Sequence, residues 1–144
     1  MHLHKFDDRN ITWRTIDWLE HVAFHVYNVD EQNRIVDVIF KFAANKHQGD
    51  VRRFVLMKHC LMQGELRFYR ANGDLKEIRP IGSYVSGVAN GEPHREGGGD
   101  QEAIVFFSNR NVEDALYEFL DDELRPVVTL GIADFKAQLD AQGK

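Results

Sequence analysis

The sequence has little of what marks membrane proteins or disulfide-rich secreted proteins. Its 144 residues include one cysteine, Cys60, and three prolines, so no internal disulfide can form and no proline-rich linker divides the chain. No apolar run approaches the roughly 20 residues of a membrane-spanning helix. The N-terminus lacks the apolar segment of a secretory signal peptide. We therefore expect a cytoplasmic protein that does not cross a membrane, with Cys60 acting as a small buried hydrophobe.

Positive charge is also scarce, because 18 basic residues stand against 23 acidic ones and give a formal net charge of −5. The basic residues are scattered, and a nucleic-acid partner is therefore not expected. The length fits one domain with one core. We expect residues 1–19 to form an N-terminal arm and residues 20–144 to form a single domain.

The apolar residues alternate with a period of two along much of the chain, which is typical of strands. Residues 22–27 and 35–42 predict one hairpin. Residues 54–61 predict a strand, with residues 65–69 as its paired return strand. Asn72-Gly73 is a strong signal for a type I′ turn, which would pair residues 75–78 with residues 66–69.

Two later segments complete the predicted elements. Residues 103–108 are apolar and rich in β-formers, and they predict a buried strand. Residues 115–130 fit either a helix or a hairpin, and the stretch around Pro126 favours the hairpin. Ile132, Phe135 and Leu139 recur at helical spacing and predict a short amphipathic helix over residues 132–141.

Together these elements predict an all-β protein, an antiparallel jelly-roll sandwich or barrel with a short C-terminal helix. A fold of this kind offers a natural pocket between its two sheets.

Two stretches resemble the motifs of the cupin superfamily. The segment Gln63-Gly64-Glu65 with the strand after it is similar to the end of the first cupin motif. Pro80-Ile81-Gly82 followed by Gly91-Glu92-Pro93-His94 is similar to the second motif, in the variant with a longer loop before its last metal-binding histidine. That variant occurs in cupins resembling the acetylacetone and dihydroxyacetophenone dioxygenases and in the cupin-like domain of zinc-binding anti-sigma factors.

The resemblance implies a metal-binding His-x-His pair about a dozen residues before Gly64, where this chain has Val51 and Arg53. The acidic ligand of the family falls near Met57, which is also a non-ligand. His94 is the position that matches a family ligand directly. The standard metal triad is therefore expected to be missing.

Other histidines could rebuild a site for a divalent metal, iron or zinc. After His94 the candidates are His59, which shares the strand parity of Met57, and His47, in a loop that could fold over the mouth of the barrel. The alternative is that His59 is a hydrogen-bonded core or pocket residue and His47 a surface residue. An inward Arg53 would repel a cation and favour a carboxylate ligand.

Three functions follow, and the first ranks highest. The first is a binding module for a small organic molecule, with a pocket lined by Arg53, Met57, His59, Tyr84, His94 and Phe106. The second, implied by the resemblance, is a non-haem metal dioxygenase-like enzyme acting on a small ketone or diketone. The third is a regulatory cupin domain. A homodimer is expected, since small single cupins commonly pair and a short sandwich leaves an open sheet edge.

Overall fold

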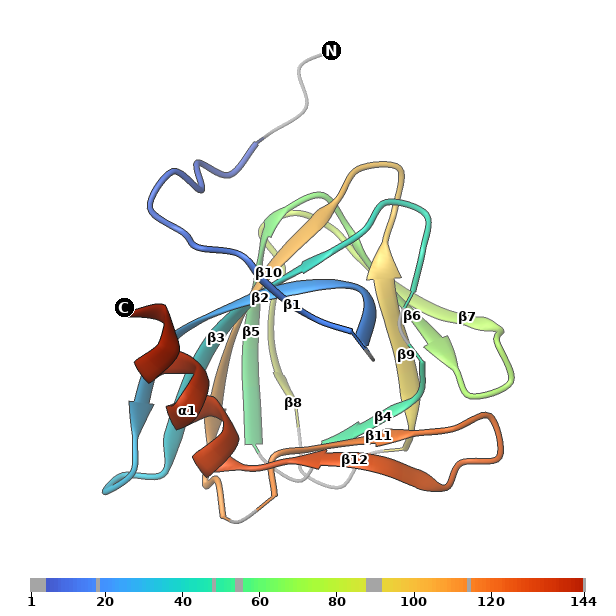
Figure 1. Cartoon of the computed structure of the whole chain (residues 1–144). Helices are drawn as coiled ribbons and strands as arrows, with labels where there is room; N and C mark the ends of the chain where they lie inside the picture. Colours follow the sequence, from blue (N-terminus) through green and yellow to red (C-terminus); the bar gives the residue numbers. More distant parts are fainter. Residues whose placement is uncertain are drawn as a thin grey trace.

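Two antiparallel sheets face each other in the computed structural model of the chain (Figure 1). The structure describes residues 5–17, 19–47, 49–53, 56–87, 92–113 and 115–143, without the side chains of residues 52, 53 and 56. Over these residues the first sheet has the strand order β1-β2-β3-β10-β5-β8 and the second β12-β11-β4-β9-β6-β7. The strands are β1 (Arg14–Ile16), β2 (Leu19–Asp30), β3 (Ile35–Phe42), β4 (Val51–Arg53), β5 (Leu56–Gln63), β6 (Leu66–Arg70), β7 (Leu75–Arg79), β8 (Tyr84–Gly87), β9 (His94–Gly98), β10 (Ala103–Arg110), β11 (Tyr117–Leu120) and β12 (Pro126–Leu130).

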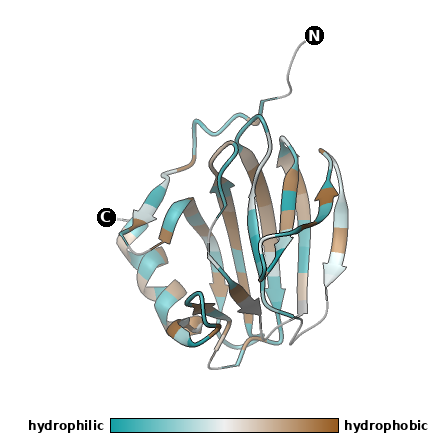
Figure 2. Ribbon diagram, turned by 90° about the vertical axis from the view of Figure 1, so that its right-hand side faces the viewer, coloured by the Kyte–Doolittle hydropathy of each residue, from teal (hydrophilic) through white to brown (hydrophobic). Residues whose placement is uncertain are grey.

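The core lies between the two sheets and follows from the alternation of side chains along each strand. Val36, Val38, Phe40 and Phe42 of β3 point inward and are all buried. Figure 2 shows hydrophobic and hydrophilic residues alternating along several strands, as expected for strands with one face in the core. This arrangement confirms the predicted all-β antiparallel fold with one C-terminal helix.

Helix α1 (Ile132–Gln142) packs against β2 and β12 at one side of the sandwich (Figure 1). At its start, the Gly131 amide donates to Asp134 Oδ2 over 2.7 Å, which satisfies an amide that the helix itself leaves open. At its end, the Gln142 side chain accepts from the Val26 amide over 2.9 Å and donates to the Val26 carbonyl over 2.8 Å. The predicted helix over residues 132–141 is confirmed to within one residue.

The predicted hairpins β2–β3, β6–β7 and β11–β12 all form. The turn between β6 and β7 differs in type from the prediction, because Gly73 has a positive φ of 94° and Asn72 does not. The Gly73 amide donates to the Arg70 carbonyl over 2.8 Å, so residues 70–73 form a turn that ends in a left-handed glycine. A type I′ turn would need positive φ at both central residues.

The predicted pairing of residues 54–61 with residues 65–69 is wrong. Strand β5 pairs with β10 and β8, whereas β6 pairs with β9 and β7 in the opposite sheet. Gly64 makes this corner with a φ of 69°, and a Cβ on it would lie 2.7 Å from the Glu102 carbonyl oxygen. The Gly-Glu step therefore moves the chain between sheets and does not close a hairpin.

The first described residues run along the outside of the first sheet. The Phe6 amide donates to Gln63 Oε1 over 3.0 Å, and Lys41 Nζ lies 4.6 Å from the centre of the Trp13 ring. Residues 14–16 form β1 and pair with β2, so the end of the expected N-terminal arm joins the sheet. Among the described residues, no helix is long and apolar enough to cross a membrane.

Candidate functional site

A cluster of polar side chains lies between the sheets near the edge strands β7 and β8. His59 on β5 is 1% exposed, and its Nε2 lies 2.7 Å from Nη1 of Arg79 on β7. Because a guanidinium can only donate, Nε2 of His59 is the acceptor and the ring proton sits on Nδ1. Nδ1 lies 2.9 Å from Met57 Sδ, a weak acceptor that suits this tautomer.

A second pair in this cluster stands on β9, where His94 and Glu96 are two residues apart and share a face. His94 Nε2 lies 2.6 Å from Glu96 Oε1, and His94 Nδ1 lies 3.2 Å from the Glu92 carbonyl oxygen. Glu96 is fully buried. Both ring nitrogens of His94 therefore lie within hydrogen-bonding distance of an oxygen atom.

Phe68 on β6 separates these two pairs and contacts both. Its ring centre lies 6.2 Å from that of His59 and 5.5 Å from that of His94. Arg79 Cζ lies 4.1 Å from the centre of the same ring, a cation–π contact. The cluster therefore consists of His59, Phe68, Arg79, His94 and Glu96, with one guanidinium and two imidazoles around one aromatic ring and Glu96 bonded to His94.

A row of rings connects this cluster to the other end of the core. His59 lies 5.2 Å from Phe107, Phe107 lies 5.4 Å from Phe40, and Phe40 lies 6.1 Å from Tyr117. Three of these four side chains are at most 2% exposed, and Phe40 is 8% exposed. The interior therefore has a polar end near β7 and β8 and an aromatic end near α1.

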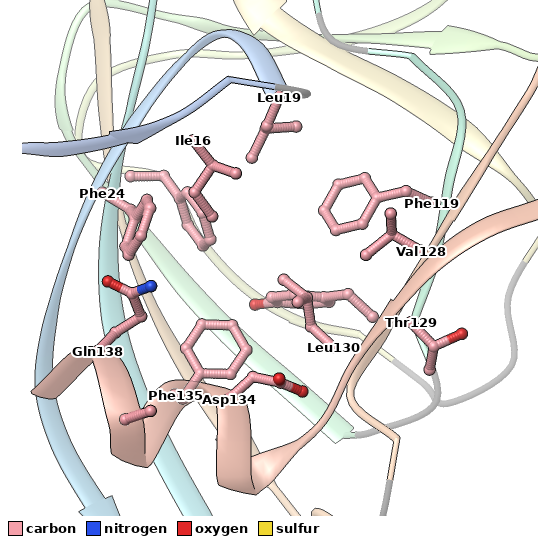
Figure 3. A pocket seen from close by; sticks show the side chains of 13 residues that line it. Ile16, Leu19, Phe24, Phe119, Val128, Thr129, Leu130, Asp134, Phe135 and Gln138 are labelled. Atoms are coloured by element: carbon pink, nitrogen blue, oxygen red, sulfur yellow. The ribbon is translucent and has the colours of Figure 1, made fainter.

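The aromatic end contains a pocket of about 350 Å³. Figure 3 shows Phe135 of α1 pointing into it, Phe24 and Leu19 of β2 on one side, and Phe119 and Val128 on the other. Its remaining lining residues are Ile16, Phe40, Tyr117, Thr129, Leu130, Asp134, Ala137 and Gln138.

Three of the polar side chains that line this pocket are already hydrogen-bonded within the protein. Tyr117 donates its hydroxyl to Asn109 Oδ1 over 3.2 Å. Asp134 accepts from the Gly131 amide, and Gln138 Oε1 accepts from Arg14 Nε over 2.9 Å. The pocket therefore presents apolar surface to an occupant, with a carboxylate at the wall formed by α1.

The structure brings together part of the pocket predicted from the sequence. Met57, His59 and His94 all face the space between the sheets, in or beside the polar cluster. His47 is exposed and its ring packs on Tyr69, with 4.9 Å between the ring centres. The side chain of Arg53 lies outside the described residues.

Two predicted pocket residues lie on the outer face of the first sheet. Tyr84 and Phe106 both stand opposite Cys60, one residue out of phase with His59, and Tyr84 is 62% exposed. Phe106 packs on Tyr27, with 5.8 Å between the ring centres. Its neighbour Phe107 is the residue that points inward.

Sequence reasoning missed Arg79, Glu96 and the whole pocket beside α1. Arg79 follows four exposed residues of β7, so nothing in the sequence separates it from a solvated charge. Glu96 stands two residues after His94, and that spacing on a strand was the available signal for a shared face.

Comparisons with known proteins bear on the fold. No protein-family model and no curated protein matches the sequence. Among solved structures, an RmlC-like cupin protein from Ralstonia eutropha is 14% identical with a TM-score of 0.74, over 99% of this chain and 88% of that one. The chain has the cupin fold. A proposed acetylacetone dioxygenase from Methylibium petroleiphilum is 13% identical with a TM-score of 0.69, over 96% of this chain and 95% of that one. An acetylacetone dioxygenase from Acinetobacter johnsonii is 13% identical with a TM-score of 0.65, over 98% of this chain and 92% of that one.

The structure shows where the residues that the resemblance singles out lie in the cupin fold. Val51, where the resemblance expects the first histidine of the pair, is the direct cross-strand partner of His94. Met57, where it expects the acidic ligand, contacts His59. Val51 and Met57 therefore each lie beside a histidine of the polar cluster.

The described side chains of this cluster do not fit a divalent metal. A catalytic metal site usually takes three protein ligands, and His59 Nε2 instead accepts from the Arg79 cation. Within the cluster, His94 and Glu96 then remain as two possible metal ligands, and they are hydrogen-bonded to each other. Across the described residues, no group of three or more His, Cys, Asp and Glu side chains is placed to hold a metal ion.

Proposed function

We propose that this cupin-fold protein is a binding protein for a small, mainly apolar organic molecule, and that the pocket beside α1 is its site. The observation that carries the proposal is the pocket of about 350 Å³ walled by aromatic and aliphatic side chains. That volume is at the lower end of the range of small-molecule pockets, which are mostly apolar with few polar groups.

The chemistry of the lining selects the class of ligand. Phe24, Phe119 and Phe135 offer ring faces and edges, which favour an aromatic or alicyclic occupant. The Asp134 carboxylate in the wall disfavours an anion, because like charges repel. A neutral, mainly apolar molecule fits best.

The alternative is a metal-dependent, dioxygenase-like enzyme. The likeness in fold to an acetylacetone dioxygenase favours it. The Arg79 bond to His59 and the engaged nitrogens of His94 argue against it. Elemental analysis of untagged protein tests it, and near-stoichiometric iron or zinc would favour the enzyme over the binding protein.

The binding proposal is tested with N-phenyl-1-naphthylamine, a neutral apolar probe whose fluorescence rises on leaving water. We expect saturable binding to the wild type. In Val128→Trp the indole enters the pocket, and we expect binding to weaken about tenfold or more, since the volume for the probe is lost.

Val127→Trp is the matched control, because Val127 is the next residue on β12 and its side chain is 64% exposed on the opposite face. We expect it to bind the probe like the wild type. Equal binding by Val128→Trp, with both variants folded by circular dichroism, would contradict the pocket as the site.

A further inference from the structure

Arg79 is the last residue of the edge strand β7, and its guanidinium is turned inward, against His59 and Phe68. Strand β7 is an edge of the second sheet and β8 an edge of the first. Arg79 stands opposite Leu66 in the β6–β7 register, and Leu66 is fully buried. The Arg79 side chain is 17% exposed, so solvent reaches it while most of its surface is covered.

The groups around Arg79 hold the guanidinium in one orientation. Phe68 lies beneath it, with 4.1 Å from Cζ to the ring centre, and His59 Nε2 accepts from Nη1. Neither of these neighbours neutralises the positive charge of Arg79, because the His59 imidazole that accepts from it is neutral and the Phe68 ring offers only its quadrupole. The carboxylate that the structure shows bonded to Arg79 is that of Glu77.

Glu77 binds the Arg79 guanidinium with only one of its two carboxylate oxygens. One oxygen, Oε2, accepts from both Nε at 3.2 Å and Nη2 at 3.0 Å. A carboxylate bound by a guanidinium in the strongest geometry uses two oxygens in two parallel bonds. The Glu77 side chain is 48% exposed, so water can solvate its carboxylate when it turns away from the guanidinium. Glu77 can therefore leave Arg79 at small cost.

We propose that Arg79 binds the carboxylate of a small organic acid at the edge strand β7, where the guanidinium reaches solvent, and that Glu77 occupies this place when the acid is absent. The incoming carboxylate takes Nε and Nη2 with both oxygens, and Glu77 turns to solvent. His59 keeps Nη1 in place, and Phe68 fixes the plane of the guanidinium. This site lies at the polar end of the core and does not depend on the apolar pocket beside α1.

The test uses benzoate as the probe and benzamide as its uncharged counterpart, with binding measured by titration calorimetry. We expect benzoate to bind and benzamide not to bind. Glu77→Gln removes the competing carboxylate, and we expect benzoate affinity to rise about two- to fivefold. Arg79→Lys keeps the positive charge but loses the two parallel N–H donors of the guanidinium, and we expect benzoate affinity to fall about tenfold.

Glu65→Gln is the matched control, since Glu65, the residue before β6, pairs with Arg67 at the same two-residue spacing, with 2.7 Å between Arg67 Nε and Glu65 Oε2. We expect it to leave benzoate binding unchanged. Equal benzoate affinity in wild type and Glu77→Gln, no benzoate binding by either, or equal binding of benzamide would each overturn the proposal.

Glu77→Gln changes a half-exposed residue and should fold, which keeps the test decisive if Arg79→Lys does not. Binding of the apolar probe by Glu77→Gln should match the wild type. Loss of benzoate binding with the apolar probe retained rejects this site alone. The reverse result rejects the pocket beside α1 alone.

Discussion

Replacing Phe135 with alanine should separate α1 from the sandwich. Phe135 is the buried residue of this helix, at 4% exposure, and its ring meets that of Tyr117 edge to face with 5.8 Å between centres. An 11-residue helix is not stable by itself in water, so α1 depends on this contact. Other attachments are weaker: Ile132 and Leu139 pack on the core while only partly buried, two hydrogen bonds join Gln142 and Val26, and Arg14 donates to Gln138.

The expected cost follows from what the ring buries. Truncating a core phenylalanine to alanine costs about 3–5 kcal/mol. Since this ring borders an existing pocket, fewer contacts are lost around it, and we expect about 3 kcal/mol, the lower end of that range. For a domain of this size the corresponding fall in Tm is roughly 10 °C.

Urea unfolding followed by circular dichroism measures the loss in the free energy of unfolding, and hydrogen exchange shows which part of the chain is destabilised. The amides of α1 should lose protection first, ahead of those of β3 and β10. Val127→Ala, at a side chain 64% exposed, is the control and should stay within about 0.5 kcal/mol of the wild type. A loss below about 1 kcal/mol, or unchanged protection of α1, would refute the role given to Phe135.

Three further predictions concern the fold and its assembly. Gly97→Ala should prevent folding or cost more than about 2 kcal/mol in urea unfolding, because its Cβ would overlap the Lys46 carbonyl oxygen, whereas Gly49→Ala has 3.9 Å to its nearest neighbour and should be mild. The Arg125 amide donates to Asp121 and lowers the pKa of this carboxylate, so the ionised carboxylate stabilises the fold above its ordinary pKa of about 4, and this stability is lost as the pH falls through the lowered pKa. Asp121→Asn should therefore flatten the fall of Tm at acid pH, and an unchanged fall would contradict this. We also propose a homodimer, since both sheets have edge strands; light scattering should give twice the chain mass of 16.7 kDa, and the monomer mass at micromolar concentration would disprove it.

The sequence by itself determined the local elements of this protein. Asn72-Gly73 sets a hairpin because turns constrain backbone dihedrals over three or four residues, whatever surrounds them. The helix over residues 132–141 and the hairpin within residues 115–130 follow from periodicity and propensity over short windows. The absence of a His-x-His pair at Val51 and Arg53 is also a property of the sequence alone.

Only the tertiary structure decided which strands pair and which side chains meet. A period of two tells which residues share a face, and it does not tell which strand lies alongside or which face is inner. The run that ends in Phe106 and Phe107 is apolar on both faces, so the sequence could not show that Phe107 is the residue turned inward.

Both proposed sites depend on this tertiary packing. Arg79 meets His59 because β5 and β7 lie in opposite sheets. The pocket beside α1 forms because β1, β2, β11, β12 and α1 converge at one side of the sandwich. Such contacts join segments far apart in the chain, and their geometry is set by the packing of the whole core, which no local pattern encodes.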